Sequence, residues 1–211
     1  NKGVYYLYNN LILPKNYKLI LNSGVNLFLA ENINIVSYNG IDIKGTKEDT
    51  VLISSIEEDK PFGAIGVLGG ENSQSYVTNL DLSNGSHGWV DNIFFSGALS
   101  IHYVDRVEII NSVISDNHSD DGLNIKYSAK VFLKGNVFDG NFSDQVDLDY
   151  CEAVVTDSKF IYYNDGINQN GDGLDLSGSI VVVNNNQFSN FLDKGLSVGE
   201  ESSVLIYENN F

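Results

Sequence analysis

The sequence has one cysteine, two prolines and no methionine, and Arg106 is its only arginine. Cys151 therefore has no partner for an internal disulfide, and we interpret it as a small apolar packing residue. A single arginine leaves little capacity to clamp an anionic ligand by paired hydrogen bonds. Basic residues number 12 against 28 acidic residues, and the resulting net charge of −16 predicts that the chain does not bind nucleic acid.

Long apolar runs and helical periodicity are also missing. No run is long enough to cross a bilayer, so the sequence predicts no transmembrane segment. No stretch repeats apolar residues with the period of an amphipathic helix, whereas many short stretches alternate with period two. The chain of 211 residues is therefore expected to form a single all-β domain.

One phrase recurs along the second half of the chain. It reads Asp-Gly-Leu-Asn-Ile from Asp121 and Asp-Gly-Leu-Asp-Leu from Asp172, and a second alternating phrase follows each copy. The copies begin at Gly97, Asp121, Asp144, Asp172 and Lys194, at intervals of 22 to 28 residues. Short strands that recur at such an interval are typical of stacked coils that share one core. The sequence therefore predicts a right-handed, single-stranded parallel β-helix (a solenoid) over residues 1–211, with coils of about 22–28 residues.

Three regions of the expected solenoid differ in regularity. Residues 1–60 form edge and early coils, residues 61–96 form irregular coils with loops, and residues 97–211 form regular acidic coils. We expect Trp89, in the irregular region, to pack against the core or a loop. Its rigid apolar face would also suit a sugar ring, which is the alternative interpretation.

Equivalent positions of successive coils stack into columns of side chains. The apolar residues that flank each position point inward, so the residues between them point outward. The first outward column is Ser100, Asn124, Asp147, Asp175 and Ser197. The second outward column, two residues further along each coil, is His102, Lys126, Asp149, Ser177 and Gly199. The candidate substrate-binding residues of this exposed face are Asn124, Asp149, His102 and Lys126, although a solvated surface residue is the simpler interpretation of His102.

A third column begins each phrase. It contains Asp121, Asp144 and Asp172, and Lys194 continues it. Strict alternation would bury these side chains, and because a buried row of carboxylates is costly, we expect them on the turn that precedes each strand. Two unit charges ~5 Å apart repel by roughly 3 kcal/mol at an effective dielectric of about 20, so the row needs compensation.

Compensation can come from a cation, a lysine, backbone N–H groups or shared protons. Calcium suits the row because it takes hard oxygen ligands in flexible geometry, while the sequence has no Cys and His cluster of the kind that zinc prefers. The candidate calcium ligands are Asp121, Asp144, Asp147, Asp172 and Asp175. The competing interpretation is that these aspartates only cap turns by accepting backbone N–H groups, with or without calcium.

The run Ser-Asp-Asp-Gly-Leu-Asn-Ile at 119–125 resembles the Ser-Asp-Asp-Gly-type motif of family 9 polysaccharide lyases. The resemblance implies a β-helix whose aspartates bind calcium and whose lysine removes the proton alpha to a uronate carboxyl group. Asp120, Asp121 and Asn124 match the motif, and Asn124 departs from an expected aspartate. Lys194 is the candidate base by its column position, although neighbouring aspartates should raise its pKa. Asp120 is the second catalytic candidate.

Polygalacturonases offer a second resemblance, in Asp120-Asp121 and in the run Lys-Gly-Leu-Ser-Val-Gly at 194–199. Lys194 stands where that family has a histidine, and the intervening coils are more numerous than in that family. Both departures argue against its hydrolytic route. The broadest resemblance covers residues 40–211 and is to the β-helix modules of bacterial cell-envelope proteins. It implies an extracellular or cell-surface location in a bacterium.

Two classes of function remain open. The first is a polysaccharide-active β-helix, acting as a calcium-assisted uronate lyase or epimerase on an acidic or neutral polysaccharide. The alternative is a non-catalytic cell-surface module that binds glycans or is structural, with turn-capping aspartates. A weaker third hypothesis is glycoside hydrolysis by paired carboxylates among Asp120, Asp121, Asp144 and Asp147. The last coil has no evident cap, so we also expect a C-terminal continuation or a partner domain.

Overall fold

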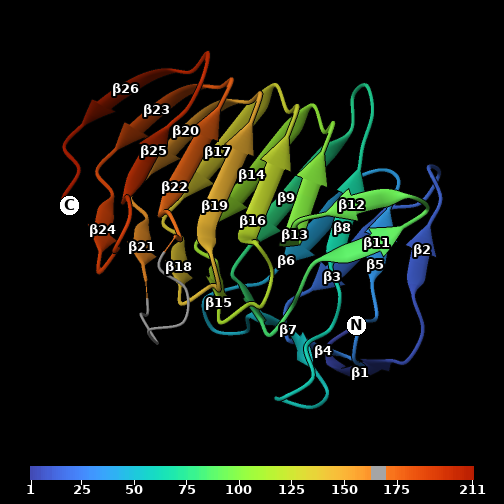
Figure 1. Cartoon of the computed structure of the whole chain (residues 1–211). Helices are drawn as coiled ribbons and strands as arrows, with labels where there is room; N and C mark the ends of the chain where they lie inside the picture. Colours follow the sequence, from blue (N-terminus) through green and yellow to red (C-terminus); the bar gives the residue numbers. More distant parts are fainter. Residues whose placement is uncertain (163–169) are drawn as a thin grey trace.

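The computed structural model describes residues 1–162 and 170–211, and these residues form a stack of β-coils (Figure 1). Three parallel sheets of eight strands each run along the stack, and successive coils add one strand to each sheet. An antiparallel pair of strands is inserted in the fourth coil. No helix occurs in the described part of the chain, in agreement with the expected all-β class.

The strands are grouped here by sheet. The first sheet contains β1 (Gly3–Leu7), β4 (Val25–Leu29), β7 (Val51–Ser55), β10 (Leu80–Ser83), β15 (Val113–Ser115), β18 (Val137–Asp139), β21 (Lys159–Ile161) and β24 (Gln187–Ser189). The second sheet contains β2 (Leu11–Leu13), β5 (Ile35–Ser37), β8 (Ile65–Leu68), β13 (Gly97–His102), β16 (Asp121–Lys126), β19 (Asp144–Asp149), β22 (Leu174–Ser177) and β25 (Leu196–Val198). The third sheet contains β3 (Leu19–Asn22), β6 (Ile41–Lys44), β9 (Gln74–Thr78), β14 (Arg106–Ile110), β17 (Lys130–Lys134), β20 (Glu152–Thr156), β23 (Ile180–Asn184) and β26 (Ser203–Tyr207). The antiparallel pair, which we call the hairpin, is β11 (Gly88–Val90) and β12 (Ile93–Phe95).

Alternation along each strand directs apolar side chains into one continuous core between the three sheets. In the second sheet, Leu99 and Leu123 pair in register and are fully buried. Along the first sheet, the rings of Phe138, Phe160 and Phe188 stack at centroid distances of 5.1 and 4.7 Å. Burying a side chain of this size contributes roughly 1.5–3 kcal/mol, so the repeated columns account for much of the stability of the stack.

Serine and asparagine side chains join successive coils at the corner that follows the third sheet. The backbone N–H of Ser112 donates to Asn136 Oδ1 over 2.9 Å, and that of Asn136 donates to Ser158 Oγ over 3.1 Å. The N–H groups of Ser158 and Asn186 donate in the same way to Asn186 Oδ1 and Asn209 Oδ1, each over 2.9 Å. We call this column the corner ladder. It satisfies buried backbone groups where the chain turns between sheets.

A stack of tyrosines occupies the corner that follows the second sheet. Tyr103, Tyr127 and Tyr150 have left-handed φ values of 57°, 54° and 53°, and Gly178 takes the same place in the next coil with a φ of 60°. Their rings lie 4.9 Å apart from centroid to centroid, with interplanar angles of 10° and 2°. A left-handed conformation costs a bulky residue roughly 1–2 kcal/mol. Each ring pair contributes about 0.5–1.5 kcal/mol, so stacking offsets much of this strain.

The hairpin interrupts the repeat and packs on the outer face of the second sheet. Its Val90 and Phe95 form a separate apolar cluster with Val36 and Ala64. Phe95 lies directly over Gly66, where an added Cβ would stand 2.6 Å from the ring. Only glycine at this position allows such a close approach, so the hairpin is fitted to the sheet beneath it. In Figure 1 the hairpin crosses the front of the stack near β8 and β13.

Trp89 does not pack against the core, contrary to the prediction. It is 66 % exposed, and its ring lies 4.9 Å from that of Phe94, which is also exposed. The two residues form a cross-strand pair, and alternation in the ribbon sends them to the face opposite Val90 and Phe95. The neighbours therefore cover the sheet while Trp89 faces solvent.

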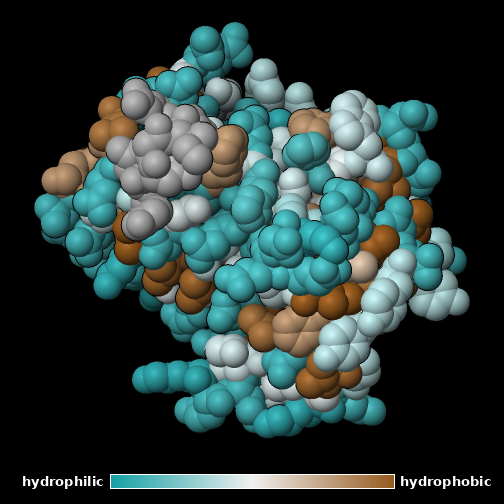
Figure 2. Space-filling model, turned by 60° about the horizontal axis from the view of Figure 1, so that its bottom comes forward, coloured by the Kyte–Doolittle hydropathy of each residue, from teal (hydrophilic) through white to brown (hydrophobic). Residues whose placement is uncertain are grey.

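The side of the stack at the bottom of Figure 1 is mainly hydrophilic, with hydrophobic residues in separate groups (Figure 2). This surface agrees with the acidic composition of the chain. Within residues 1–162 and 170–211, no helix is long and apolar enough to span a membrane.

Candidate functional site

The outward columns predicted from the sequence are in register in the second sheet. Asn124 pairs with Asp147, and Asp147 pairs with Asp175 in the next coil. Lys126 pairs with Asp149 between the same strands, β16 and β19. Adjacent strands lie about 4.8 Å apart, so these side chains are neighbours on one surface. We call the outer surface formed by Lys126, Asp147, Asp149 and Asp175 the carboxyl face.

The hairpin covers one end of these columns. Ser100 and Asn124 are fully buried and His102 is 6 % exposed, whereas Asp147 is partly exposed. The prediction that Ser100, Asn124 and His102 are exposed is therefore wrong. The repeat correctly indicates their outward direction. Phe95 packs against His102, with ring centroids 5.4 Å apart, and it lies over Gly66, the register partner of Ser100. Asn124 is enclosed between its hydrogen-bond partners His102 and Asp147.

A row of hydrogen bonds leads from beneath the hairpin to the carboxyl face. Nε2 of His102 lies 2.9 Å from Oδ1 of Asn124, and Nδ2 of Asn124 donates to Oδ2 of Asp147 over 2.8 Å. Because the amide nitrogen donates to Asp147, the amide oxygen faces the imidazole, which places a proton on Nε2 of His102. Burial lowers the pKa of His102 by more than the bond to Asn124 raises it, so the ring is neutral at neutral pH.

Asp147 holds a proton at neutral pH. Burial raises its pKa to about 9, and the neighbouring carboxylates of Asp121, Asp149 and Asp175 add to this effect while Lys126 opposes it. Since Oδ2 accepts the amide N–H described above, the proton of the neutral carboxyl belongs on Oδ1. An ion pair of 2.8 Å between Lys126 Nζ and Asp149 Oδ2 lies on the same face.

The third column departs from the prediction in its first two members, whereas Asp172 and Lys194 precede strands β22 and β25 as expected. Asp121 and Asp144 begin strands β16 and β19 instead of lying on the preceding turns, and Asp121 is only 3 % exposed. Burial raises the pKa of Asp121, and likewise that of Asp144, to about 7. Asp144 Oδ1 also accepts the backbone N–H of Asp172 over 2.7 Å, and Asp172 Oδ1 accepts that of Lys194 over 3.2 Å. Retained protons and backbone capping thus offset the cost of burial.

Lys194 is held as a cation. Its Nζ lies 2.5 Å from Asp193 Oδ2 and 3.1 Å from Asp172 Oδ1, and both carboxylates raise its pKa, to about 12. A protonated lysine cannot accept a proton, so this charge state opposes the base role, which stays a prediction. Asp120, the second catalytic candidate, is exposed, and its backbone oxygen accepts the N–H of Asp144 over 2.9 Å.

Among residues 1–162 and 170–211, no group of three or more His, Cys, Asp or Glu side chains is arranged to hold a metal ion. Three of the five predicted calcium ligands have separate hydrogen-bond partners. Asp147 accepts a side-chain amide, while Asp144 and Asp172 accept backbone N–H groups. The arrangement as it stands does not fit a calcium ion, and calcium binding stays a prediction.

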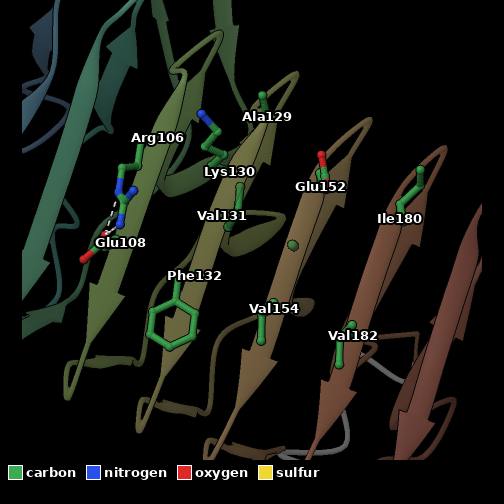
Figure 3. A pocket seen from close by; sticks show the side chains of 11 residues that line it. Arg106, Glu108, Ala129, Lys130, Val131, Phe132, Glu152, Val154, Ile180 and Val182 are labelled. Atoms are coloured by element: carbon green, nitrogen blue, oxygen red, sulfur yellow. Dashed lines mark hydrogen bonds and ion pairs between the residues drawn. The ribbon is translucent and has the colours of Figure 1, made fainter.

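Sequence reasoning missed a hollow of about 670 Å³ on the third sheet (Figure 3). Phe132, Val154 and Val182 lie on its floor, and the ion pair of Arg106 and Glu108 lies at one side. The signal in the sequence is that Val154 and Val182 each lie within a run of consecutive apolar residues. Such a run places an apolar side chain on the outer face of the strand as well as in the core. None of the predicted site residues lines this hollow.

The model of a protein family described as right handed beta helix region matches residues 82–211, more than half of the chain. The chain belongs to the right-handed β-helix family. Membership confirms the predicted fold class, together with the three parallel sheets. The matched part of this β-helix includes the hairpin and the whole carboxyl face.

No curated protein matches the sequence of this β-helix. Among solved structures, ORF18 of Geobacillus virus E2 is similar over 88 % of this chain and 44 % of its own, with 14 % identity and a TM-score of 0.31. This β-helix therefore spans less than half the length of the viral protein. An alginate lyase from Paenibacillus sp. str. FPU-7 is similar over 92 % of this chain and 99 % of its own, with 11 % identity and a TM-score of 0.24. Likenesses this distant carry no argument about this chain.

Proposed function

We propose that this β-helix cleaves a polysaccharide at the carboxyl face, with Asp147 as the acid that protonates the leaving oxygen. The row from His102 through Asn124 to Asp147 carries the proposal, because it fixes one carboxyl at a partly exposed position. Further carboxyls stand beside it in register, as bond cleavage between sugars by paired carboxyl groups requires. Asn124 and His102 are positioning residues in this proposal.

A general acid must hold its proton at the working pH and release it to the substrate. Burial and the neighbouring carboxylates keep the proton on Asp147, as described above. The bond from Asn124 fixes Oδ2 and leaves Oδ1 to donate the proton. After donation, the same N–H and the ammonium of Lys126 stabilise the anion.

Two carboxyls are placed for the second role. Asp175 is the partner of Asp147 in the next coil, at a strand spacing of about 4.8 Å. That spacing is close to the ~5–5.5 Å between carboxyls of retaining glycosidases. Asp149 lies two residues along the strand, roughly 6.6 Å away, which is nearer to the inverting range. Because Asp149 already binds Lys126, Asp175 is the stronger candidate for the nucleophile.

Electrostatics favour an uncharged polysaccharide. A uronate polymer would meet the carboxyl face of a chain with a net charge of −16, and like charges repel. A calcium-assisted uronate lyase or epimerase would need calcium to offset that repulsion, and it would need Lys194 to lose a proton despite a pKa of about 12. We therefore place hydrolysis of a neutral polymer first and elimination or epimerisation second.

The experiment is a turnover screen on xylan, mannan, chitin, alginate and polygalacturonate, with and without calcium. Released reducing ends measure hydrolysis, and ultraviolet absorbance of unsaturated sugars measures elimination. We expect turnover of a neutral polymer by the wild type and a loss of about 10²–10⁴-fold in Asp147→Asn, the range typical of a removed general acid. The matched control is Asp81→Asn, because burial also raises the pKa of Asp81, which lies on β10 in the first sheet.

The outcomes separate the hypotheses. Equal loss in Asp147→Asn and Asp81→Asn would indicate a folding defect and contradict the role of Asp147. Unsaturated products from a uronate polymer, dependent on calcium and Lys194, would replace hydrolysis by the lyase reaction. Turnover of no polymer would overturn the enzymatic proposal.

A second candidate is a non-catalytic module at the bacterial cell surface that binds glycans. The capped aspartates favour it, since Asp144 and Asp172 accept backbone N–H groups and so have a structural use. Binding of a polysaccharide without turnover in the same screen would support this candidate. An extracellular or cell-surface location belongs to both candidates as a proposal.

A further inference from the structure

Side chains of the same type repeat along the axis of the stack and not along the strands. Asp147 and Asp175 follow one another in one column, and Tyr103, Tyr127 and Tyr150 stack in the same direction at the ends of neighbouring strands. A linear polymer also repeats one unit along its length. It meets the same side chains repeatedly only when it lies parallel to the stack axis, across the strands at their ~4.8 Å spacing.

The hairpin lies across this direction on the outer face of the second sheet. Phe95 rests on Gly66 of β8 and packs against His102 at the end of β13. The Tyr38 hydroxyl donates to Asp91 Oδ2 over 2.8 Å and so ties the tip of the hairpin to the segment after β5. The hairpin is therefore joined to the sheet at several points along its length.

The covered and open parts of the first outward column meet beside the proposed acid. Ser100 and Asn124 are fully buried, and Asp147 in the next coil is the first partly exposed member. Asp175 and Ser197 continue the partly exposed part of the column. A polymer along the axis can thus extend from Asp147 toward β25, while in the other direction it meets Phe95 of the hairpin at His102 on β13, two strand spacings (~9.6 Å) from β19.

The geometry points to an end-acting enzyme, in which the hairpin stops the polymer so that Asp147 reaches only the linkages next to a chain end. This inference rests on the proposed function and adds its mode of action. An enzyme with an unobstructed face would cut internal linkages, because the polymer could pass over the acid in both directions. Here the space between the hairpin and Asp147 fits a terminal sugar or a short terminal segment.

The test follows the lengths of the first products. The substrates are oligosaccharides of xylan, mannan and chitin that carry a fluorophore at either the reducing or the other end. We expect the wild type to release one short product from the first time points, with one of the two labels blocking the reaction. Products of all intermediate lengths from the wild type would overturn the inference and leave the proposed function intact.

Two variants open the obstructed side. Phe95→Ala removes the ring that lies on Gly66 and His102, and Tyr38→Phe removes the bond to Asp91. Each variant should shift the population toward molecules whose hairpin has moved off the sheet. The amount of products of intermediate length should then rise by about tenfold or more. The matched control is Trp89→Ala, because Trp89 lies in the same hairpin but faces away from the sheet, and its product pattern should equal that of the wild type.

If none of the oligosaccharides is cleaved, a binding measurement tests whether the hairpin obstructs the polymer. The same labelled oligosaccharides should then bind with one end free and lose affinity when that end is blocked. Phe95→Ala should restore binding of the blocked form. Equal binding of both labelled forms to the wild type would contradict the obstruction, and binding of none of the oligosaccharides would overturn both the inference and the proposed function.

Discussion

The side-chain amide of Asn124 donates to Oδ2 of Asp147 over 2.8 Å, and this bond crosses from the covered to the open part of the second sheet. Asn124 is fully buried, whereas Asp147 is partly exposed. The hairpin and the proposed acid are thereby linked through two buried residues, His102 and Asn124. A substitution at Asn124 acts on both.

Asn124→Ala should lower the free energy of unfolding by about 1–3 kcal/mol, because His102 and Asp147 each lose a buried hydrogen-bond partner. Urea unfolding measures the change. The matched control is Asn39→Ala, which removes an amide that donates at the surface to the backbone oxygen of Lys15 over 3.2 Å. The control should change stability by less than about 0.5 kcal/mol, and an equal effect of both substitutions would contradict the importance of the buried row.

The stability of the protein should fall as the pH rises through the neutral range. The pKa values of Asp121, Asp144 and Asp147 are raised in the folded state above the ~3.9 of an unfolded aspartate. Their contribution is fully present below the unfolded pKa and is lost as the pH rises through the folded values of about 7 and about 9.

Asp147→Asn tests this dependence, because asparagine is neutral at every pH. Between pH about 5 and about 9 the variant should lose less free energy of unfolding than the wild type. Urea unfolding at several pH values measures both slopes, and the exposed Asp59→Asn is the control that should keep the wild-type slope. Parallel slopes for the wild type and Asp147→Asn would show that Asp147 is ionised over this range.

Lys194→Gln should keep turnover within about threefold of the wild type if Asp147 drives the reaction, since a change of that size is below 1 kcal/mol. The lost pairs with Asp172 and Asp193 involve a side chain that is 46 % exposed, so stability should change by no more than about 1 kcal/mol. Turnover of the polymer found in the screen is the measurement. A loss of activity by several orders of magnitude would restore Lys194 as the candidate base.

Tyr127 is the middle ring of the tyrosine stack, so Tyr127→Ala should remove two ring contacts and lower stability by about 1–3 kcal/mol. Tyr127→Gly removes the same contacts but relieves the left-handed backbone at φ 54°. The glycine variant should therefore be the more stable of the two by about 1 kcal/mol. Urea unfolding compares them, and a less stable glycine variant would show that the backbone at this corner is not strained.

Calcium should bind the carboxyl face only weakly, with a dissociation constant on the order of 10⁻⁴–10⁻³ M or above. The reason is that three of the predicted ligands, Asp144, Asp147 and Asp172, already accept N–H groups, and no metal-binding group is found in the described part of the chain. Calorimetric titration of the wild type and of Asp144→Ala/Asp172→Ala measures the affinity. Micromolar binding that disappears in the double variant would show that these aspartates rearrange around the ion.

The sequence predicts the repeating part of this molecule well, because each coil is checked by its neighbours. The register of Asn124, Asp147 and Asp175 follows directly from the spacing of the recurring phrase. The hairpin could not be predicted in the same way, since it occurs once and interrupts the period. Its absence from the prediction explains the wrong exposure of Ser100 and His102.

The position of Asp121 illustrates a different limit. Alternation placed it in the buried half of the strand, and the cost of a buried charge argued for moving it to a turn. In the structure it begins the strand and is 3 % exposed, because a buried carboxyl can keep its proton. Protonation depends on surroundings that a repeat pattern does not specify.

The corner ladder allows the number of coils to change one coil at a time. Asn136, Asn186 and Asn209 each accept the backbone N–H of the preceding coil and donate their own amide to a backbone carbonyl, those of Ile109, Val155 and Val183 respectively. Every such joint presents the same donor and acceptor to its neighbour. A whole coil can therefore be duplicated or deleted in evolution while the hydrogen bonds between the remaining coils stay the same. The hairpin differs, because the contact of Phe95 with Gly66 occurs at one coil.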